Sequence, residues 1–218
     1  MPTLVITLYI VVLPSSSPKS HKLHVALLGL ASSIALTAFI TDVIKNGVGR
    51  PRPDLIARCK PRQGTPEHEL VDWTVCTETD HHTLHDGFRS FPSGHSSFSW
   101  AGLGYLGLFL AGQLRALRPR RGLGRVVIAG LPAVAALLIT ISRTEDYRHD
   151  VYDVTAGTLI GAVCAGFCYR RYFPSLKDRV CDLPFEKGEE DEAEEGEEGF
   201  ERVPDVEMQV HDGRSGRV

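Results

Sequence analysis

Four long apolar runs alternate with polar segments along the 218-residue chain. A helix that crosses a lipid bilayer needs about 20 mainly apolar residues, and each run is of that order. Small residues recur within the runs, which allows membrane helices to approach closely. The pattern predicts an all-α, integral membrane helical bundle, and four such runs in so short a chain disfavour a soluble bundle. The predicted spans are residues 23–44, 96–114, 123–142 and 151–173.

The two ends of the chain differ from this membrane-embedded domain, which we assign to residues 23–173. Residues 1–22 hold the apolar run "TLVITLYIVVL", which is short for a span and lacks the preceding basic region of a signal peptide. It could be part of a longer span. Residues 174–218 hold the run "EKGEEDEAEEGEEGFE", whose charge predicts a disordered acidic tail.

Charge is distributed unevenly between the tail and the rest of the chain. The net charge of −3 reflects mainly the acidic tail, and without the tail the chain is basic. A basic body suits an anionic substrate or lipid headgroups, although basic residues beside membrane spans give the same balance. The five cysteines are too few for a disulfide-built scaffold.

The order of the spans predicts which segments share a face of the membrane. Because consecutive spans alternate in direction, the loops 45–94 and 142–150 are expected on one face. The link 115–122 and the tail then lie on the other face, which is rich in Arg and Lys and is therefore predicted to be cytoplasmic. Cys59 and Cys76 share the first loop and could form a disulfide in an oxidising compartment, or could equally be unpaired.

The first cluster of residues suited to binding or catalysis is "KNGVGRPRP", at the end of the first predicted span. It places Lys45, Arg50 and Arg52 within eight residues, with prolines that stiffen the turn. By itself, such a cluster is more often a basic anchor for lipid headgroups than a binding site.

The second cluster is "FPSGHSSFSW", at the start of the second predicted span. Ser93 can cap the helix, Gly94 allows backbone N–H groups to approach a ligand, and the helix start favours an anion beside His95. The alternative is a capped membrane helix whose histidine faces the interface.

The third cluster, "ISRTEDYRHDVYDVTAG", lies between the last two spans. His149 and Asp153 are one helical turn apart, so the carboxylate can accept the Nδ1 proton and leave Nε2 free as a nucleophile or base. Arg143 can bind a phosphate-like oxyanion in a bidentate manner. A salt-bridged loop would explain the charges, but not this pair at the edge of the lipid.

Together the three clusters resemble the signature of the type 2 phosphatidic acid phosphatase superfamily. The matching elements are Lys45 with Arg52-Pro53, then Pro92-Ser93-Gly94-His95, then Ser142-Arg143 with His149 and Asp153. The likeness covers residues 23–173 and is strongest to fungal diacylglycerol pyrophosphate phosphatases and animal phospholipid phosphatases. It implies the helical core shared by acid phosphatases and vanadium-dependent haloperoxidases. Family members usually have six spans, which implies a chain that is short at its N-terminus.

The resemblance also implies roles for the clustered residues. His149 would attack phosphorus and form a phosphohistidine, oriented by Asp153. His95 would protonate the leaving oxygen and then activate water. The implied phosphate-binding residues are Lys45, Arg52, Ser93, Gly94 and Arg143.

We therefore expect a metal-independent lipid phosphate phosphatase with no cofactor, acting on phosphatidate, lysophosphatidate or diacylglycerol pyrophosphate. Its expected partners are this substrate and the membrane, without nucleic acid. The expected location is an endomembrane (vacuole, Golgi or endoplasmic reticulum) or the plasma membrane, with the site lumenal or extracellular. His81, His82 and His85 could bind zinc, although a solvated histidine-rich loop is the simpler interpretation.

Three other functions fit the sequence less well. Polyprenyl diphosphate or sphingoid-base phosphate hydrolysis would use the same signature, because the signature binds the phosphate and not the lipid tail. A catalytically silent membrane adaptor would have no need of His95, His149 and Asp153 together. A soluble haloperoxidase is disfavoured by the four apolar spans.

Overall fold

The computed structural model describes residues 1–14, 17–66, 68–119 and 122–185, and these residues form helices and loops with no strand. The predicted all-α fold is confirmed for the described part. The elements, in order, are α1 (Pro2–Val12), α2 (Lys19–Val48), α3 (Leu55–Cys59), the 3₁₀ turn η1 (Trp73–Val75), α4 (His81–Gly87), α5 (Gly94–Ser99), the π-helical η2 (Trp100–Gly104), α6 (Tyr105–Gln113), α7 (Leu123–Glu145) and α8 (Val151–Tyr172).

Three of the described helices, α2, α7 and α8, are long and apolar enough to cross a membrane. The remaining predicted span, 96–114, is not one regular α-helix. Instead, α5, η2 and α6 follow one another directly, with helical dihedral angles at both junctions. The π segment is where Trp100 turns its indole Nε1 to donate to Thr140 Oγ1 of α7, at 3.2 Å. The helical path from Gly94 to Gln113 thus covers the predicted span, with a π-helical stretch that interrupts the α-helical hydrogen bonding.

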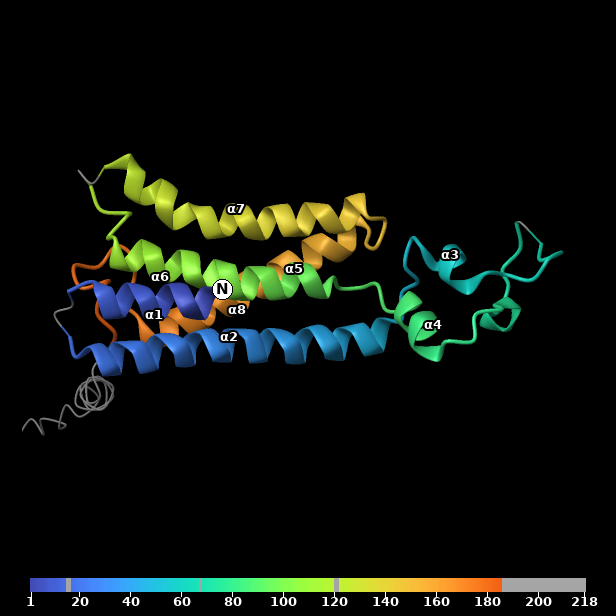
Figure 1. Ribbon diagram of the computed structural model, residues 1–218, viewed down its shortest axis with the longest axis horizontal. Coiled ribbons are helices and arrows are strands. Elements are labelled where there is room, and N and C mark those ends of the chain that lie inside the picture. The colour runs from blue at the N-terminus through green and yellow to red at the C-terminus, as the bar shows by residue number, and fades with distance from the viewer. Residues whose placement is uncertain (15–16, 67, 120–121, 186–218) are drawn as a thin grey trace, which may run out of the picture. The chain divides into compact units, whose positions relative to one another are not determined.

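The long helices pack side by side as a bundle, and α1 lies against α2 and α6 (Figure 1). An aromatic cluster fills one end of the core. Tyr169 and Phe173 stack with their ring centroids 5.2 Å apart, and Phe109 meets Phe173 edge-on at 6.1 Å. Ile6 and Ile10 of α1 are buried in the same core, so this short apolar helix is part of the packed bundle.

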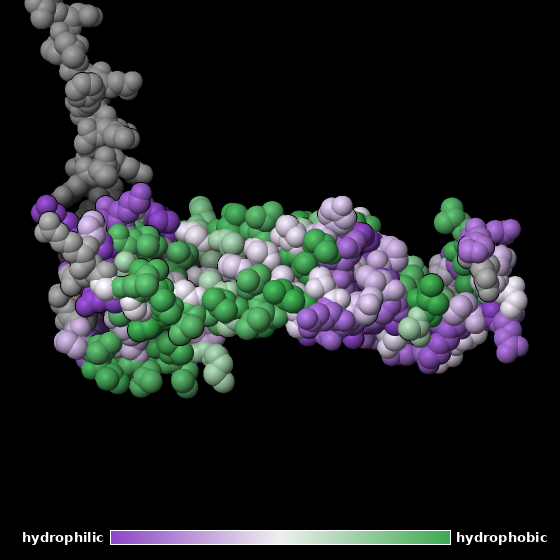
Figure 2. All heavy atoms as spheres, turned by 90° about the horizontal axis from the view of Figure 1, so that it is seen from above, coloured by the Kyte–Doolittle hydropathy of each residue, from purple (hydrophilic) through white to green (hydrophobic). Residues whose placement is uncertain are grey.

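Apolar side chains cover the outer face of the bundle helices, and polar ones gather toward the end that carries α3 and α4 (Figure 2). On α8, for example, Leu159, Val163 and Phe167 are all exposed. A helix that presents large apolar residues outward, without another element to cover them, suits a lipid environment.

The loop between α2 and α5 and the short loop between α7 and α8 meet at one end of the bundle. The longer loop holds α3, η1 and α4 and is closed by a disulfide between Cys59 and Cys76, so the pairing that the sequence left open is present. Arg50 of this loop forms an ion pair with Asp150 of the other loop, at 2.9 Å.

Residues after α8 remain packed on the opposite end of the bundle. Arg115 pairs with Asp182 at 2.9 Å, and Cys181 is fully buried. The compact unit runs to Pro184, so it extends beyond the predicted domain boundary at residue 173. The acidic run of the predicted tail lies in residues 186–218, outside the described residues.

Two glycines bring α8 into close contact with the start of the α5–η2 segment. A Cβ added at Gly157 would overlap the carbonyl oxygen of Ser93, and one added at Gly161 would overlap that of Ser97. Because these obstacles are backbone atoms, they cannot move aside as a flexible side chain could. This contact holds the second and third sequence clusters together.

We expect Gly161→Ala to destabilise the folded protein by about 1–3 kcal/mol, a typical cost of overpacking. The midpoint of thermal unfolding in detergent micelles measures this loss. Gly166→Ala is the matched control, because the same methyl group on α8 would meet no atom within 4 Å. Equal midpoints for the two variants would contradict the close approach of α8.

Candidate active site

The N-terminus of α8 positions Asp153. Asp150 caps the helix by accepting a hydrogen bond from Val151 N, and its own backbone N–H donates to Asp153 Oδ2 at 3.1 Å. Such a reciprocal capping box fixes both carboxylates at the first turn. Asp153 is fully buried, so its charge depends on the donors around it.

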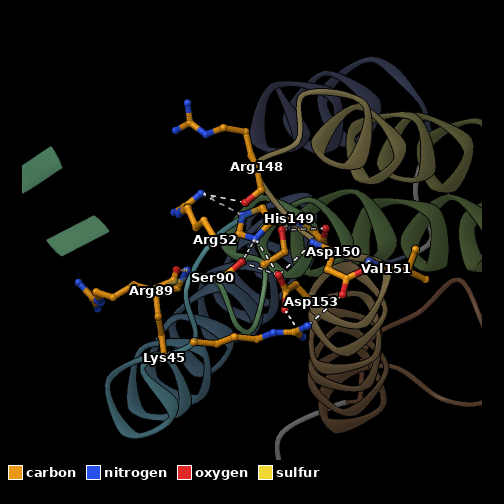
Figure 3. Close-up of polar contacts among 12 residues, drawn as sticks. Lys45, Arg52, Arg89, Ser90, Arg148, His149, Asp150, Val151 and Asp153 are labelled. Carbon is orange, nitrogen blue, oxygen red and sulfur yellow. Dashed lines mark hydrogen bonds and ion pairs between the residues drawn. The ribbon is translucent and has the colours of Figure 1, made fainter. Parts of the chain in front are cut away.

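Two residues from the preceding loops supply further donors to Asp153 (Figure 3). Arg50 Nη1 donates to Asp153 Oδ1 at 3.0 Å, while Arg50 Nη2 binds Asp150. Ser90 Oγ donates to Asp153 Oδ2 in a short hydrogen bond. Each carboxylate oxygen of Asp153 therefore accepts a hydrogen bond, as a buried polar group requires.

His149 lies four residues before Asp153, in the loop that precedes the N-cap of α8 and not on the helix as the spacing predicts, and its side chain is almost completely buried. Its Nδ1 is 3.6 Å from Asp153 Oδ2 and 3.3 Å from Ser90 Oγ. Its other ring nitrogen, Nε2, is 3.5 Å from Arg52 Nη1 (Figure 3). The ring thus presents Nε2 to a guanidinium and Nδ1 to the acidic side of the site.

Arg52 is held by α4. Its Nε donates to the Asp86 carbonyl oxygen and its Nη2 to Asp86 Oδ1, both at 2.8 Å. Arg58 of α3 binds the other carboxylate oxygen of Asp86 at 3.0 Å. This bracing leaves Nη1 of Arg52 directed at His149 and able to bind an oxyanion there.

Lys45 and the start of α5 form the neighbouring wall. Ser93 N donates to the backbone oxygen of Asp153 at 2.9 Å, and the Ser93 side chain caps α5. Lys45 Nζ donates to the Arg89 carbonyl oxygen at 3.2 Å and lies 4.0 Å from where a Cβ of Gly94 would be. The lysine charge and the N-terminus of α5 therefore face the same space, which favours an anion.

His95 and Arg143 complete the group of predicted residues. The His95 side chain is exposed, and its ring lies within electrostatic reach of Arg143 and Arg52. Arg143 itself forms an ion pair with Asp146 at 3.0 Å. All eight residues singled out from the sequence thus lie at one end of the bundle.

The electrostatic environment keeps His149 neutral. Burial, followed by the positive charges of Arg52 and Lys45, lowers the pKa of His149, and the Asp153 carboxylate only partly opposes this. A histidine whose pKa is lowered keeps its lone pair at neutral pH. His149 can therefore act as a nucleophile or base.

Sequence reasoning missed two members of the site and gave a third no role. Ser90 and Asp86 were missed because neither belongs to a recognisable spacing, and Arg50 was noted only as part of a basic cluster. Among the described residues, no group of three or more His, Cys, Asp and Glu side chains could hold a metal ion, so His81, His82 and His85 do not form one.

Comparison with known proteins shows the family to which the chain belongs. Residues 26–177 match the family model described as the PAP2 superfamily, and the chain belongs to this family. The matched residues include all three clusters of the signature. With its apolar spanning helices, it is a multi-pass membrane protein.

Several curated proteins are similar to the chain. It is 46% identical over 189 residues to diacylglycerol pyrophosphate phosphatase 1 of Saccharomyces cerevisiae, covering 85% of this chain and 64% of that one. It is 44% identical to a probable diacylglycerol pyrophosphate phosphatase 1 of Schizosaccharomyces pombe, over 77% of this chain and 60% of that one. Lipid phosphate phosphatase 2 of Arabidopsis thaliana is 42% identical, over 72% of this chain and 54% of that one. The chain thus spans somewhat less than two thirds of these relatives' length, and no solved structure matches it.

We expect His149 to titrate below its ordinary pKa of 6.5, because burial and the charge of Arg52 disfavour the imidazolium. NMR of ring-labelled histidine in detergent micelles measures the midpoint, with the signal assigned by its loss in His149→Gln. Arg52→Gln should raise the midpoint, since it removes a positive charge. A midpoint at or above 6.5 in the unsubstituted protein would show that Asp153 dominates instead.

Proposed function

We propose that the protein hydrolyses phosphate monoesters or pyrophosphates of membrane lipids without a metal ion, through a phosphohistidine on His149. The observation that carries this proposal is the geometry of His149, a neutral buried imidazole whose Nε2 faces Arg52. Such a ring combines a free nucleophilic lone pair with a guanidinium that can bind the phosphoryl group under attack.

In the first step, the Nε2 lone pair forms a bond to phosphorus while the bond from phosphorus to the lipid-side oxygen breaks. The leaving oxygen takes the electron pair of that bond and a proton from His95. Negative charge on the three equatorial oxygens is stabilised by Lys45, Arg52 and Arg143, with Ser93 and Gly94 at the N-terminus of α5.

In the second step, His95, now neutral, takes a proton from water as the water oxygen attacks phosphorus. The bond between phosphorus and Nε2 breaks, its electron pair returns to the ring, and inorganic phosphate leaves. Each proton that His95 gives in the first step is recovered in the second, so the enzyme is regenerated.

A lipid substrate is supported by two observations. The candidate site lies at the end of apolar helices that suit a bilayer, and the similar proteins are named as phosphatases of diacylglycerol pyrophosphate or lipid phosphate. We propose phosphatidate, lysophosphatidate or diacylglycerol pyrophosphate as substrates. Polyprenyl diphosphates and sphingoid-base phosphates offer the same phosphate chemistry and are the alternatives, whereas a silent adaptor would leave the buried His149–Asp153 pair without a use.

The purified protein should release phosphate from these lipids in mixed micelles that contain excess EDTA, because cationic side chains replace a metal in the proposed mechanism. Vanadate should inhibit, since its trigonal form resembles the transferring phosphoryl group. His149→Ala should lose at least about a thousandfold of kcat, as expected when a covalent nucleophile is removed.

The matched control is His82→Ala, which removes an exposed histidine of α4 that takes no part in the site. This variant should keep the unsubstituted rate. A strict magnesium requirement, or substantial turnover by His149→Ala, would defeat the proposal.

We propose that the site faces the lumen or the extracellular space. The link 115–122 holds four arginines and α8 ends with Arg170 and Arg171, and basic residues beside spans favour the cytoplasm. Arg50 and Asp150, from the loops at the other end of the bundle, meet at the site. This orientation fits an endomembrane of the vacuole, Golgi or endoplasmic reticulum, or the plasma membrane.

Protease added to sealed endomembrane vesicles with the cytoplasmic face outward tests this orientation. It should remove an epitope placed after Val218 and spare one inserted near Gln63. The reverse pattern would mean an inverted topology. Solubilising the vesicles with detergent provides the control, because both epitopes should then be cut.

A further inference from the structure

The predicted direct hydrogen bond between His149 and Asp153 is not formed. The separation of 3.6 Å between Nδ1 and Asp153 Oδ2 exceeds hydrogen-bonding distance. Ser90 Oγ lies nearer to the ring, at 3.3 Å from Nδ1, and also donates to Asp153 Oδ2. A serine hydroxyl therefore stands between the two residues that the sequence pairs.

The positions of the protons follow from which groups can only donate and which can only accept. Arg52 can only donate, so the Nε2 atom that faces it is unprotonated and Nδ1 carries the ring proton. An ionised Asp153 can only accept, so the Ser90 hydroxyl proton is directed at Asp153. The remaining lone pairs of Ser90 Oγ then face Nδ1–H as an acceptor.

Ser90 is held firmly in this place. It is fully buried, and its backbone N–H donates to the Arg50 carbonyl oxygen at 2.9 Å. The Arg50 guanidinium in turn binds Asp153 Oδ1. One residue, Arg50, thus fixes Ser90 through its backbone and Asp153 through its side chain.

We propose that Ser90 is a positioning residue that relays the hydrogen bond of Asp153 to Nδ1 of His149. This inference rests on the proposed function, in which Nε2 attacks phosphorus. The relay fixes the tautomer that leaves Nε2 unprotonated, and it stabilises the positive charge that the ring gains as the bond to phosphorus forms. No proton needs to leave Nδ1 at any stage.

The kinetic test compares Ser90→Ala with Ser90→Thr, which keeps a hydroxyl. Groups that orient a functional histidine contribute about 10- to 100-fold to activity at metal sites, and we expect a loss of that order in kcat for Ser90→Ala, with little change in KM. Ser90→Thr should recover part of it. Ser33→Ala is the matched control, because Ser33 is also a fully buried serine but donates to the Ala101 carbonyl oxygen, away from the site.

A double-mutant cycle separates a relay from a merely structural role. If Ser90 acts through Asp153, Ser90→Ala should cost much less kcat in an Asp153→Asn background than in the unsubstituted protein. Independent, multiplying effects of the two substitutions would overturn the relay. If the unsubstituted protein and Ser33→Ala are active and Ser90→Ala equals them, this inference fails while the proposed function stands.

A second readout does not depend on activity. In ¹⁵N-histidine NMR, the unsubstituted protein should show a hydrogen-bonded Nδ1–H proton for His149, assigned by its loss in His149→Gln. Ser90→Ala should weaken or remove this signal, and Ser33→Ala should leave it unchanged. An unaltered signal in Ser90→Ala would mean that Asp153 holds the ring directly, whether or not the protein proves to be a lipid phosphatase.

Discussion

The buried carboxylate of Asp153 is the feature on which the arrangement of the site depends. A charge without water must be compensated by donors, and removing one partner of a buried ion pair costs about 3–5 kcal/mol. Here the donors come from three separate places in the sequence: Arg50 after α2, Ser90 before α5, and the backbone of Asp150 before α8. The need to satisfy one carboxylate therefore draws three chain segments together, and with them the residues for which we propose phosphate binding.

The same constraint explains how several cations can share a small space. Lys45, Arg52 and Arg143 would repel one another if nothing opposed their charge. Asp86 and Asp146 offset two of them through ion pairs of 2.8 and 3.0 Å. The site thus keeps a positive character toward a ligand while acids hold the two arginines in position and the Arg89 carbonyl oxygen accepts from Lys45. An arriving phosphate would find donors that are already oriented.

The sequence predicts the local parts of this structure better than the long-range ones. Apolar runs of spanning length identify α2, α7 and α8, and the four-residue spacing of His149 and Asp153 correctly brings them close together, although His149 lies just before the helix and not on it. Ser90 and Asp86 could not be found in this way, because their partners are 63 and 34 residues distant and no periodicity links them. The π segment at Trp100 could not be predicted either, because α-helical and π-helical segments have the same apolar composition. The predicted contact between His149 and Asp153 was also incomplete. Their spacing brings the two side chains together but does not reveal the Ser90 hydroxyl that lies between them.

The disulfide between Cys59 and Cys76 closes part of the long loop covalently. The chain from residue 59 to 76 is a closed ring, so a single cut of the backbone inside it opens the ring without dividing the molecule. Arg52 lies before the ring and Asp86 after it, and their ion pair would therefore remain intramolecular after such a cut. Insertions or fused domains placed between the two cysteines would likewise leave the arginine and its acidic partner tethered.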